Sequence, residues 1–211
     1  MNEKSLANKS VASKTPIIIL LVIGFISGLL STGSFHTQSG SSFSYSSWYI
    51  PGLLFGFGIA CYFFIFKKAR SFINLFAFLA ISGIAYFSAV IVFISSFGFI
   101  GGLVDGVSAG NTQIVGGIGG SNGSVLMYAI GAAVGTAILL LGFHSQFMRL
   151  QSKEWLRLLL YGIALSVVSF LLTEPIIILF NLQGYYTFSP VILIWQTGMA
   201  GALGWAIATR E

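Results

Sequence analysis

Residues 171–180, LLTEPIIILF, place a carboxylate beside a proline in an otherwise apolar run. An apolar environment favours the neutral form of a carboxyl group, so Glu174 could hold or exchange a proton. Pro175 has no backbone N–H and therefore leaves the carbonyl of Leu171 free for another partner. Ionisable side chains within membrane-spanning segments commonly mark ion or substrate pathways. We expect Glu174 and Pro175 to belong to a substrate- or proton-binding site; the alternative is that Glu174 is a shallow helix-end acid that reaches water.

Gln196 is the predicted partner of this carboxylate. At 1.5 Å per residue, Glu174 lies about 9 Å from the end of its apolar run, and Gln196 lies about 10 Å from the start of the next run. The connection between the two runs, NLQGYYTF, is short, so the two helices should pack antiparallel. The two side chains would then lie at similar depth and could form a hydrogen bond. Tyr86 is a further neutral partner that we assign to the same site.

Catalytic and metal-binding patterns are absent from the sequence. The single cysteine, Cys61, lies in an apolar run, and the two histidines, His36 and His144, fall at opposite ends of the expected helices. We find no nucleophile with an adjacent base and no spacing typical of metal ligands. We therefore expect neither an enzyme, nor a metal, nor a cofactor.

The elements that position these residues follow from the composition. Of 211 residues, 56% are hydrophobic and 7% are charged, whereas soluble domains contain about 25% charged residues. Long uncharged runs of roughly 20 residues predict membrane-crossing helices. The expected fold is therefore all-α, a bundle of six transmembrane helices in one domain over residues 15–209, with short tails at 1–14 and 210–211. The six predicted spans are Thr15–Ser31, Trp48–Phe66, Ser71–Phe97, Ser124–His144, Trp155–Phe180 and Ser189–Thr209.

The basic residues orient these spans. All ten lie in or beside the tails and connections on one predicted side, with Arg157 at the very start of the fifth span: Lys4, Lys9, Lys14, Lys67, Lys68, Arg70, Arg149, Lys153, Arg157 and Arg210. Positively charged segments stay in the cytoplasm during insertion, so both termini should be cytoplasmic and the protein should lie in the cell (inner or plasma) membrane. The isoelectric point near 9.5 is then a topology signal. We expect the lipid bilayer as a partner and no nucleic acid.

The first apolar run has two interpretations. A basic lead, a short apolar stretch and small residues after it are also typical of a signal peptide. The stretch contains no A-x-A pattern before the small residues Ser31-Thr32-Gly33. We therefore favour an uncleaved helix.

Glycines recur on the three spans that run toward the basic side. Small residues three or four positions apart allow helix backbones to approach closely in lipid, and we expect packing by Gly52, Gly56, Gly131, Gly135, Gly198, Gly201 and Gly204. The recurrence also suggests three helical hairpins, over residues 15–66, 71–144 and 155–209. The glycine-rich segment 101–124 is expected to be a flexible outer loop.

Two functions fit these features. The polar site, the proline and the glycine-rich helices favour a small-solute transporter or channel component whose site faces outward. The scarcity of polar residues also fits a non-catalytic accessory or assembly subunit that acts within a homo-oligomer or with another membrane protein. The sequence does not name a substrate.

Overall fold

The computed structural model describes residues 3–36, 49–67, 71–105, 122–179 and 188–210. Every regular element within these ranges is a helix, which confirms the all-helical prediction. The six helices are α1 (Glu3–His36), α2 (Ile50–Phe66), α3 (Phe72–Asp105), α4 (Asn122–Gln146), α5 (Ser152–Leu179) and α6 (Phe188–Ala208). Their order and number follow the six predicted apolar runs.

Five of the helices are long and apolar enough to cross a membrane, and α2 is a shorter apolar helix of 17 residues. Helix α1 begins before the predicted span, at Glu3, and α3 continues past the predicted end to Asp105. The predicted outer loop 101–124 is therefore wrong at both margins, because helix extends into it from each side. Glycine lowers helix propensity by only about 1 kcal/mol, so Gly101 and Gly102 do not end α3. The middle of that loop, residues 106–121, and the earlier outer connection, 37–48, lie outside the described residues.

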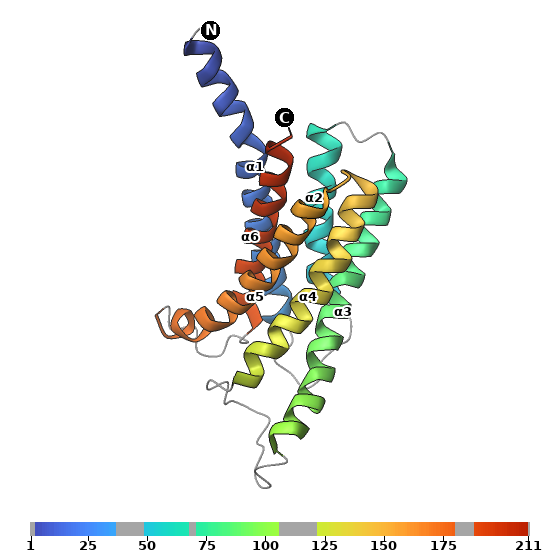
Figure 1. The fold of residues 1–211 in the computed structure, drawn as a ribbon, viewed down its shortest axis with the longest axis vertical. Coiled ribbons are helices and arrows are strands. Elements are labelled where there is room, and N and C mark those ends of the chain that lie inside the picture. Colours follow the sequence, from blue (N-terminus) through green and yellow to red (C-terminus); the bar gives the residue numbers. More distant parts are fainter. Residues whose placement is uncertain (1–2, 37–48, 68–70, 106–121, 180–187, 211) are drawn as a thin grey trace.

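The helices alternate in direction along the bundle (Figure 1), and their contacts form a closed ring. Each helix contacts the next one along the chain, and α6 returns to pack against α1 over most of its length. The start of α1, the facing ends of α2 and α3, the facing ends of α4 and α5, and the end of α6 lie at the same end of the bundle. The three predicted hairpins are thus neighbours within a ring, in which the most extensive contact joins the first helix to the last.

The distribution of side chains is inverted relative to a water-soluble protein. Large apolar side chains cover the outer surface, and several are mostly exposed, such as Ile73 and Leu179 at 78% each. The buried interior instead contains hydroxyl and amide groups as well as apolar side chains: Ser27, Ser31, Ser82, Thr136, Ser166, Ser169, Thr173 and Gln196. Large contiguous apolar surfaces indicate an apolar surrounding or a partner, so the outer surface of the ring is suited to lipid.

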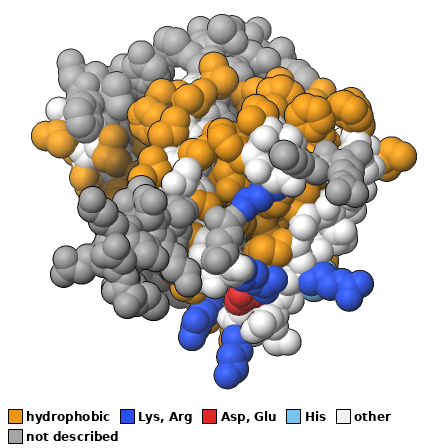
Figure 2. Space-filling model, turned by 90° about the horizontal axis from the view of Figure 1, so that it is seen from above, with side chains coloured by type: hydrophobic (Ala, Val, Ile, Leu, Met, Phe, Trp, Pro, Cys, Tyr) orange, Lys and Arg blue, Asp and Glu red, His pale blue; other side chains and the backbone are white. Residues whose placement is uncertain are grey.

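The basic side chains gather at the end of the bundle that holds the termini (Figure 2). There Arg210, just after α6, donates from Nε to Glu154 Oε1 at 3.1 Å and forms an ion pair with the same carboxylate. Glu154 also accepts a hydrogen bond from the backbone N–H of Gln151 at 2.8 Å, which is one of the two hydrogen bonds of a capping box, at the start of α5. The neighbouring turn is held by the Leu150 N–H, which donates to His144 Nδ1 at 2.9 Å.

Glycines allow the helix backbones to approach. A β-carbon at Gly56 would lie 2.6 Å from the Cβ of Ser82, and one at Gly204 would lie 2.8 Å from the Cα of Ile17. Both separations are shorter than a normal van der Waals contact, so a larger residue would force the helices apart. The same holds, to differing degrees, at Gly52, Gly131, Gly135, Gly198 and Gly201.

Candidate ligand cavity

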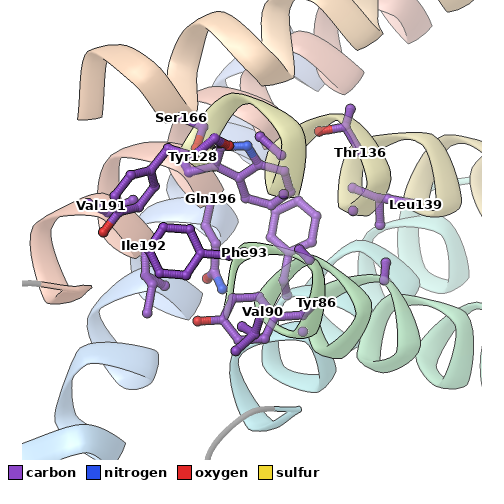
Figure 3. Close-up of a pocket in the computed structure, with 18 of the residues that line it drawn as sticks. Tyr86, Val90, Phe93, Tyr128, Thr136, Leu139, Ser166, Val191, Ile192 and Gln196 are labelled. Carbon is purple, nitrogen blue, oxygen red and sulfur yellow. Dashed lines mark hydrogen bonds between the residues drawn. The ribbon is translucent and has the colours of Figure 1, made fainter. Parts of the chain in front are cut away.

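A cavity of about 270 Å³ lies inside the helical ring, lined by α2, α3, α4, α5 and α6 (Figure 3). Most of its wall is apolar and several rings contribute to it. The residues that line it are Gly52, Phe55, Ser82, Ala85, Tyr86, Ala89, Val90, Phe93, Ile94, Tyr128, Gly131, Ala132, Gly135, Thr136, Leu139, Ser166, Val191, Ile192, Trp195 and Gln196. None of these described residues carries a charge. The structure therefore brings the predicted site residues Tyr86 and Gln196 to one cavity.

Gln196 anchors the polar side of this cavity. Its side chain is 1% exposed, and its Nε2 donates to the Pro51 carbonyl of α2 at 2.9 Å and to Ser31 Oγ of α1 at 3.3 Å. Its Oε1 accepts from Ser27 Oγ of α1 at 2.8 Å. Because a backbone carbonyl can only accept, the atom facing Pro51 must be the amide nitrogen. One side chain of α6 thus joins the first two helices, and each such hydrogen bond between membrane helices contributes about 0.6 kcal/mol on average.

Tyr86 lies opposite, on α3. A β-carbon at Gly52 would meet the Tyr86 Cβ at 2.7 Å, so α2 and α3 approach closely where the tyrosine begins. Beside it, Ser82 Oγ donates to the Gly52 carbonyl at 2.7 Å. In Figure 3 the hydroxyl of Tyr86 and the amide of Gln196 point into the same part of the cavity. Among the described residues, the Tyr86 hydroxyl makes no hydrogen bond, so it remains available to an occupant.

Two aromatic clusters lie in the bundle, one nearer the basic end and one that contributes to the cavity wall. Toward the basic end, Phe63 stacks on Phe147 with ring centroids 4.1 Å apart, and Phe78 contacts Phe147 at 4.8 Å. Toward the other end, Tyr128 lies 4.7 Å from Phe93 and 4.4 Å from Phe170, again between ring centroids. The clusters bring together side chains of α2, α3 and α4 at the basic end and of α3, α4 and α5 at the other. Phe93 and Tyr128 of the second cluster also form part of the cavity wall.

Thr136 differs from the other buried polar side chains. Buried serines and threonines of this bundle donate to carbonyls, as Thr173 does to the Ser169 carbonyl at 2.8 Å. Thr136 is 0% exposed and its Oγ1 has no hydrogen-bond partner among the described residues. The hydroxyl lies instead against Gly162 of α5, where a β-carbon would meet it at 2.5 Å. Thr136 thus combines a buried hydroxyl with an apolar contact.

The carboxylate singled out in the sequence is placed only by its backbone. Glu174 lies within α5, one turn beyond Phe170, and its side chain lies outside the described part of the structure. The predicted hydrogen bond between Glu174 and Gln196 stays a prediction, and the bonds of Gln196 described here go to α1 and α2. Pro175 is exposed, and the end of α5 that contains it turns away from the other helices (Figure 1). Within the described residues no group of three metal-ligating side chains occurs.

Several residues of the site were not anticipated from the sequence. Trp195 borders the cavity and donates from Nε1 to the Gly162 carbonyl of α5 at 3.1 Å, which fixes its indole ring. Ser27 and Ser31 hold the Gln196 amide from α1. A signal for the serines existed, because Ser27 and Ser31 are spaced four apart and so share a face of one helix. No comparable signal paired that face with Gln196, which is 165 or more positions away.

Comparisons of the chain with models of protein families, with curated proteins and with solved structures found no match.

Proposed function

We propose that this protein crosses the cell membrane six times, with both termini in the cytoplasm, and binds a small uncharged solute inside its ring of helices as a transporter or channel component. The observation that carries the proposal is the cavity of about 270 Å³ that is lined by the five helices from α2 to α6. Its wall is mostly apolar, and Tyr86 and Gln196 contribute polar groups to it. Sites for small molecules are typically apolar clefts with a few polar groups that fix the orientation of the ligand.

The orientation is supported by the ring itself. An even number of alternating helices places both termini at one end, and the Lys and Arg side chains gather at that end (Figure 2). Retention of basic segments on the cytoplasmic side supports a cytoplasmic location for this end. Helix α2, at 17 residues, is at the lower limit for crossing the hydrocarbon core. Glu174 remains a candidate proton-binding group on the opposite half of α5.

A cavity-filling substitution tests the proposal. Ala132 lines the cavity, whereas Ala133 does not, although both are half-buried on α4. We expect some members of a panel of small uncharged solutes to raise the melting temperature of the purified wild-type protein. Binding at 100 times the Kd stabilises a protein by about 2.7 kcal/mol. Ala132→Phe should abolish the response by occupying the cavity, and Ala133→Phe should retain it.

The accessory-subunit alternative predicts a different result. A protein that acts only in assembly should give no thermal response to any solute and should instead purify with a membrane-protein partner at fixed stoichiometry. That result, or a solute response that survives Ala132→Phe, would contradict the proposed binding site.

A further inference from the structure

The chemistry of the cavity wall defines a class of ligand, an inference that rests on the proposed function. No Asp, Glu, Lys, Arg or His occurs among the described residues that line the cavity. A charged ligand would lose its hydration there without a compensating ion pair, which costs many kcal/mol in a medium of low dielectric. The wall therefore selects against ions and zwitterions and in favour of neutral molecules.

The size and shape of the wall restrict the ligand further. A cavity of about 150 Å³ lined by apolar side chains is known to hold a benzene molecule, and the present cavity is larger, at about 270 Å³. Aromatic rings lie on several sides of it, from Phe55 on α2, Phe93 on α3 and Trp195 on α6. Rings of this kind pack favourably against another ring in stacked or edge-to-face geometry. A single six-membered ring with one or two small substituents fits this space.

The polar groups show where the ligand needs an oxygen atom. The amide of Gln196 already donates to Pro51 and Ser31 and accepts from Ser27. The Trp195 N–H is likewise occupied, by the Gly162 carbonyl. The hydroxyl of Tyr86 reaches the cavity and makes no hydrogen bond to the described residues, and a phenolic O–H that is enclosed in this way normally finds a partner. An acceptor on the ligand would supply that partner.

We propose that the cavity binds an uncharged molecule built on one aromatic or similar six-membered ring with a hydrogen-bond-accepting oxygen, and that Tyr86 donates to this oxygen. The rings of the wall provide affinity for the apolar body. The Tyr86 hydroxyl provides discrimination, because a ligand without the oxygen leaves this donor unpaired. Tyr86 is therefore the specificity-determining residue of the site.

The test uses two probes of nearly equal shape, acetophenone and isopropylbenzene, which differ in the carbonyl oxygen. Their affinities are measured for the wild-type protein, for Tyr86→Phe and for the control Tyr62→Phe, which removes a hydroxyl from a buried tyrosine that does not line the cavity. Each affinity is expressed as a ratio to wild type, so that partition of the probe into detergent or lipid cancels. Far-ultraviolet circular dichroism and melting temperature establish that each variant is folded.

Tyr86→Phe should weaken acetophenone binding roughly fivefold or more, as expected for the loss of one hydrogen bond, and should leave isopropylbenzene binding within about twofold of wild type. Tyr62→Phe should change neither affinity. Ala132→Phe should abolish binding of both probes, which places them in the cavity.

Each other outcome overturns a defined part of the inference. Equal effects of Tyr86→Phe on both probes, or no effect on either, would refute the role of the hydroxyl while solute binding in the cavity stands. Failure of both probes to bind the wild-type protein would refute the proposed ligand class. The solute panel with Ala132→Phe then decides separately whether the cavity binds any solute.

Discussion

At the scale of single residues, the polar groups of this bundle differ in how completely they are paired. Gln196 uses both amide atoms in bonds to α1 and α2, whereas the Oγ1 of Thr136 has no partner in the described structure. A buried hydroxyl without a partner costs about 1–3 kcal/mol of stability, because its bonds to water are lost and not replaced. The two residues therefore contribute to the free energy of unfolding with opposite signs.

Replacement of Thr136 by valine should raise stability. The substitution preserves the branched shape, removes the unpaired hydroxyl and leaves the contact with Gly162 in place. The matched control is Thr173→Val on α5, which removes a hydroxyl that donates to the Ser169 carbonyl at 2.8 Å. We expect Thr136→Val to raise the free energy of unfolding by about 1 kcal/mol and Thr173→Val not to raise it. Thermal unfolding in detergent measures both, and equal shifts would contradict the assignment of Thr136 as unpaired.

The polar site could be predicted only in part, and Gln196 shows why. An amide within an apolar run must find partners, so its importance followed from composition and position. Its nearest helix along the chain is α5, which suggested Glu174, whereas the bonds described go to Ser27, Ser31 and Pro51 on α1 and α2. Which helices supply the hydrogen-bond partners of Gln196 depends on the rotation of α6 about its axis and on closure of the ring of helices. Neither quantity is encoded in local spacing.

At the scale of elements, α1 is an integral part of the fold. Its Gly24 and Gly28 lie against α6, where β-carbons would meet the Gln196 carbonyl oxygen at 2.6 Å and the Leu193 Cα at 2.9 Å. A cleaved signal peptide would leave these contacts empty and Gln196 without two of its partners. The retention of the first apolar run as an uncleaved helix stays a prediction. The number and order of the helices were predictable from hydropathy, whereas the full lengths of α1 and α3 and the pairing of the first helix with the last were not. Hairpin connections indicate only sequential neighbours.

Two glycines of α6 should respond differently to the same substitution. A β-carbon at Gly204 would meet backbone atoms of α1, the Ile17 Cα at 2.8 Å and the Pro16 oxygen at 2.9 Å. One at Gly198 would meet only the side chain of Leu165, at 2.7 Å, which can change rotamer. Both changes to alanine gain the same helix propensity. We expect Gly204→Ala to destabilise the protein by about 1–3 kcal/mol relative to Gly198→Ala, measured by thermal unfolding; equal stability would show that α1 and α6 can separate freely.

At the scale of the whole molecule, the closed ring of helices and the distribution of charged side chains together determine how the basic end of the bundle is packed. Alternating helices bring the α2–α3 and α4–α5 connections to the end that holds both termini (Figure 1). Arg210 and Glu154 pair at that end and tie the last helix to the start of α5. Near the same end, the side chain of Phe63 of α2 stacks on that of Phe147, which follows α4. A path from the basic end of the bundle to the cavity would therefore have to separate these packed groups.

The orientation can be measured with single cysteines. In a Cys61→Ser background, Ser152→Cys places a thiol at the exposed start of α5, at the basic end, and Tyr49→Cys places one at the start of α2, at the opposite end. Because basic segments are retained in the cytoplasm, a membrane-impermeant maleimide should label Tyr49→Cys in intact cells. It should label Ser152→Cys only after the membrane is permeabilised. Labelling of both thiols from outside would contradict a membrane-crossing α2. Reversed labelling would place the termini outside and turn the Tyr86 and Gln196 side of the cavity toward the cytoplasm.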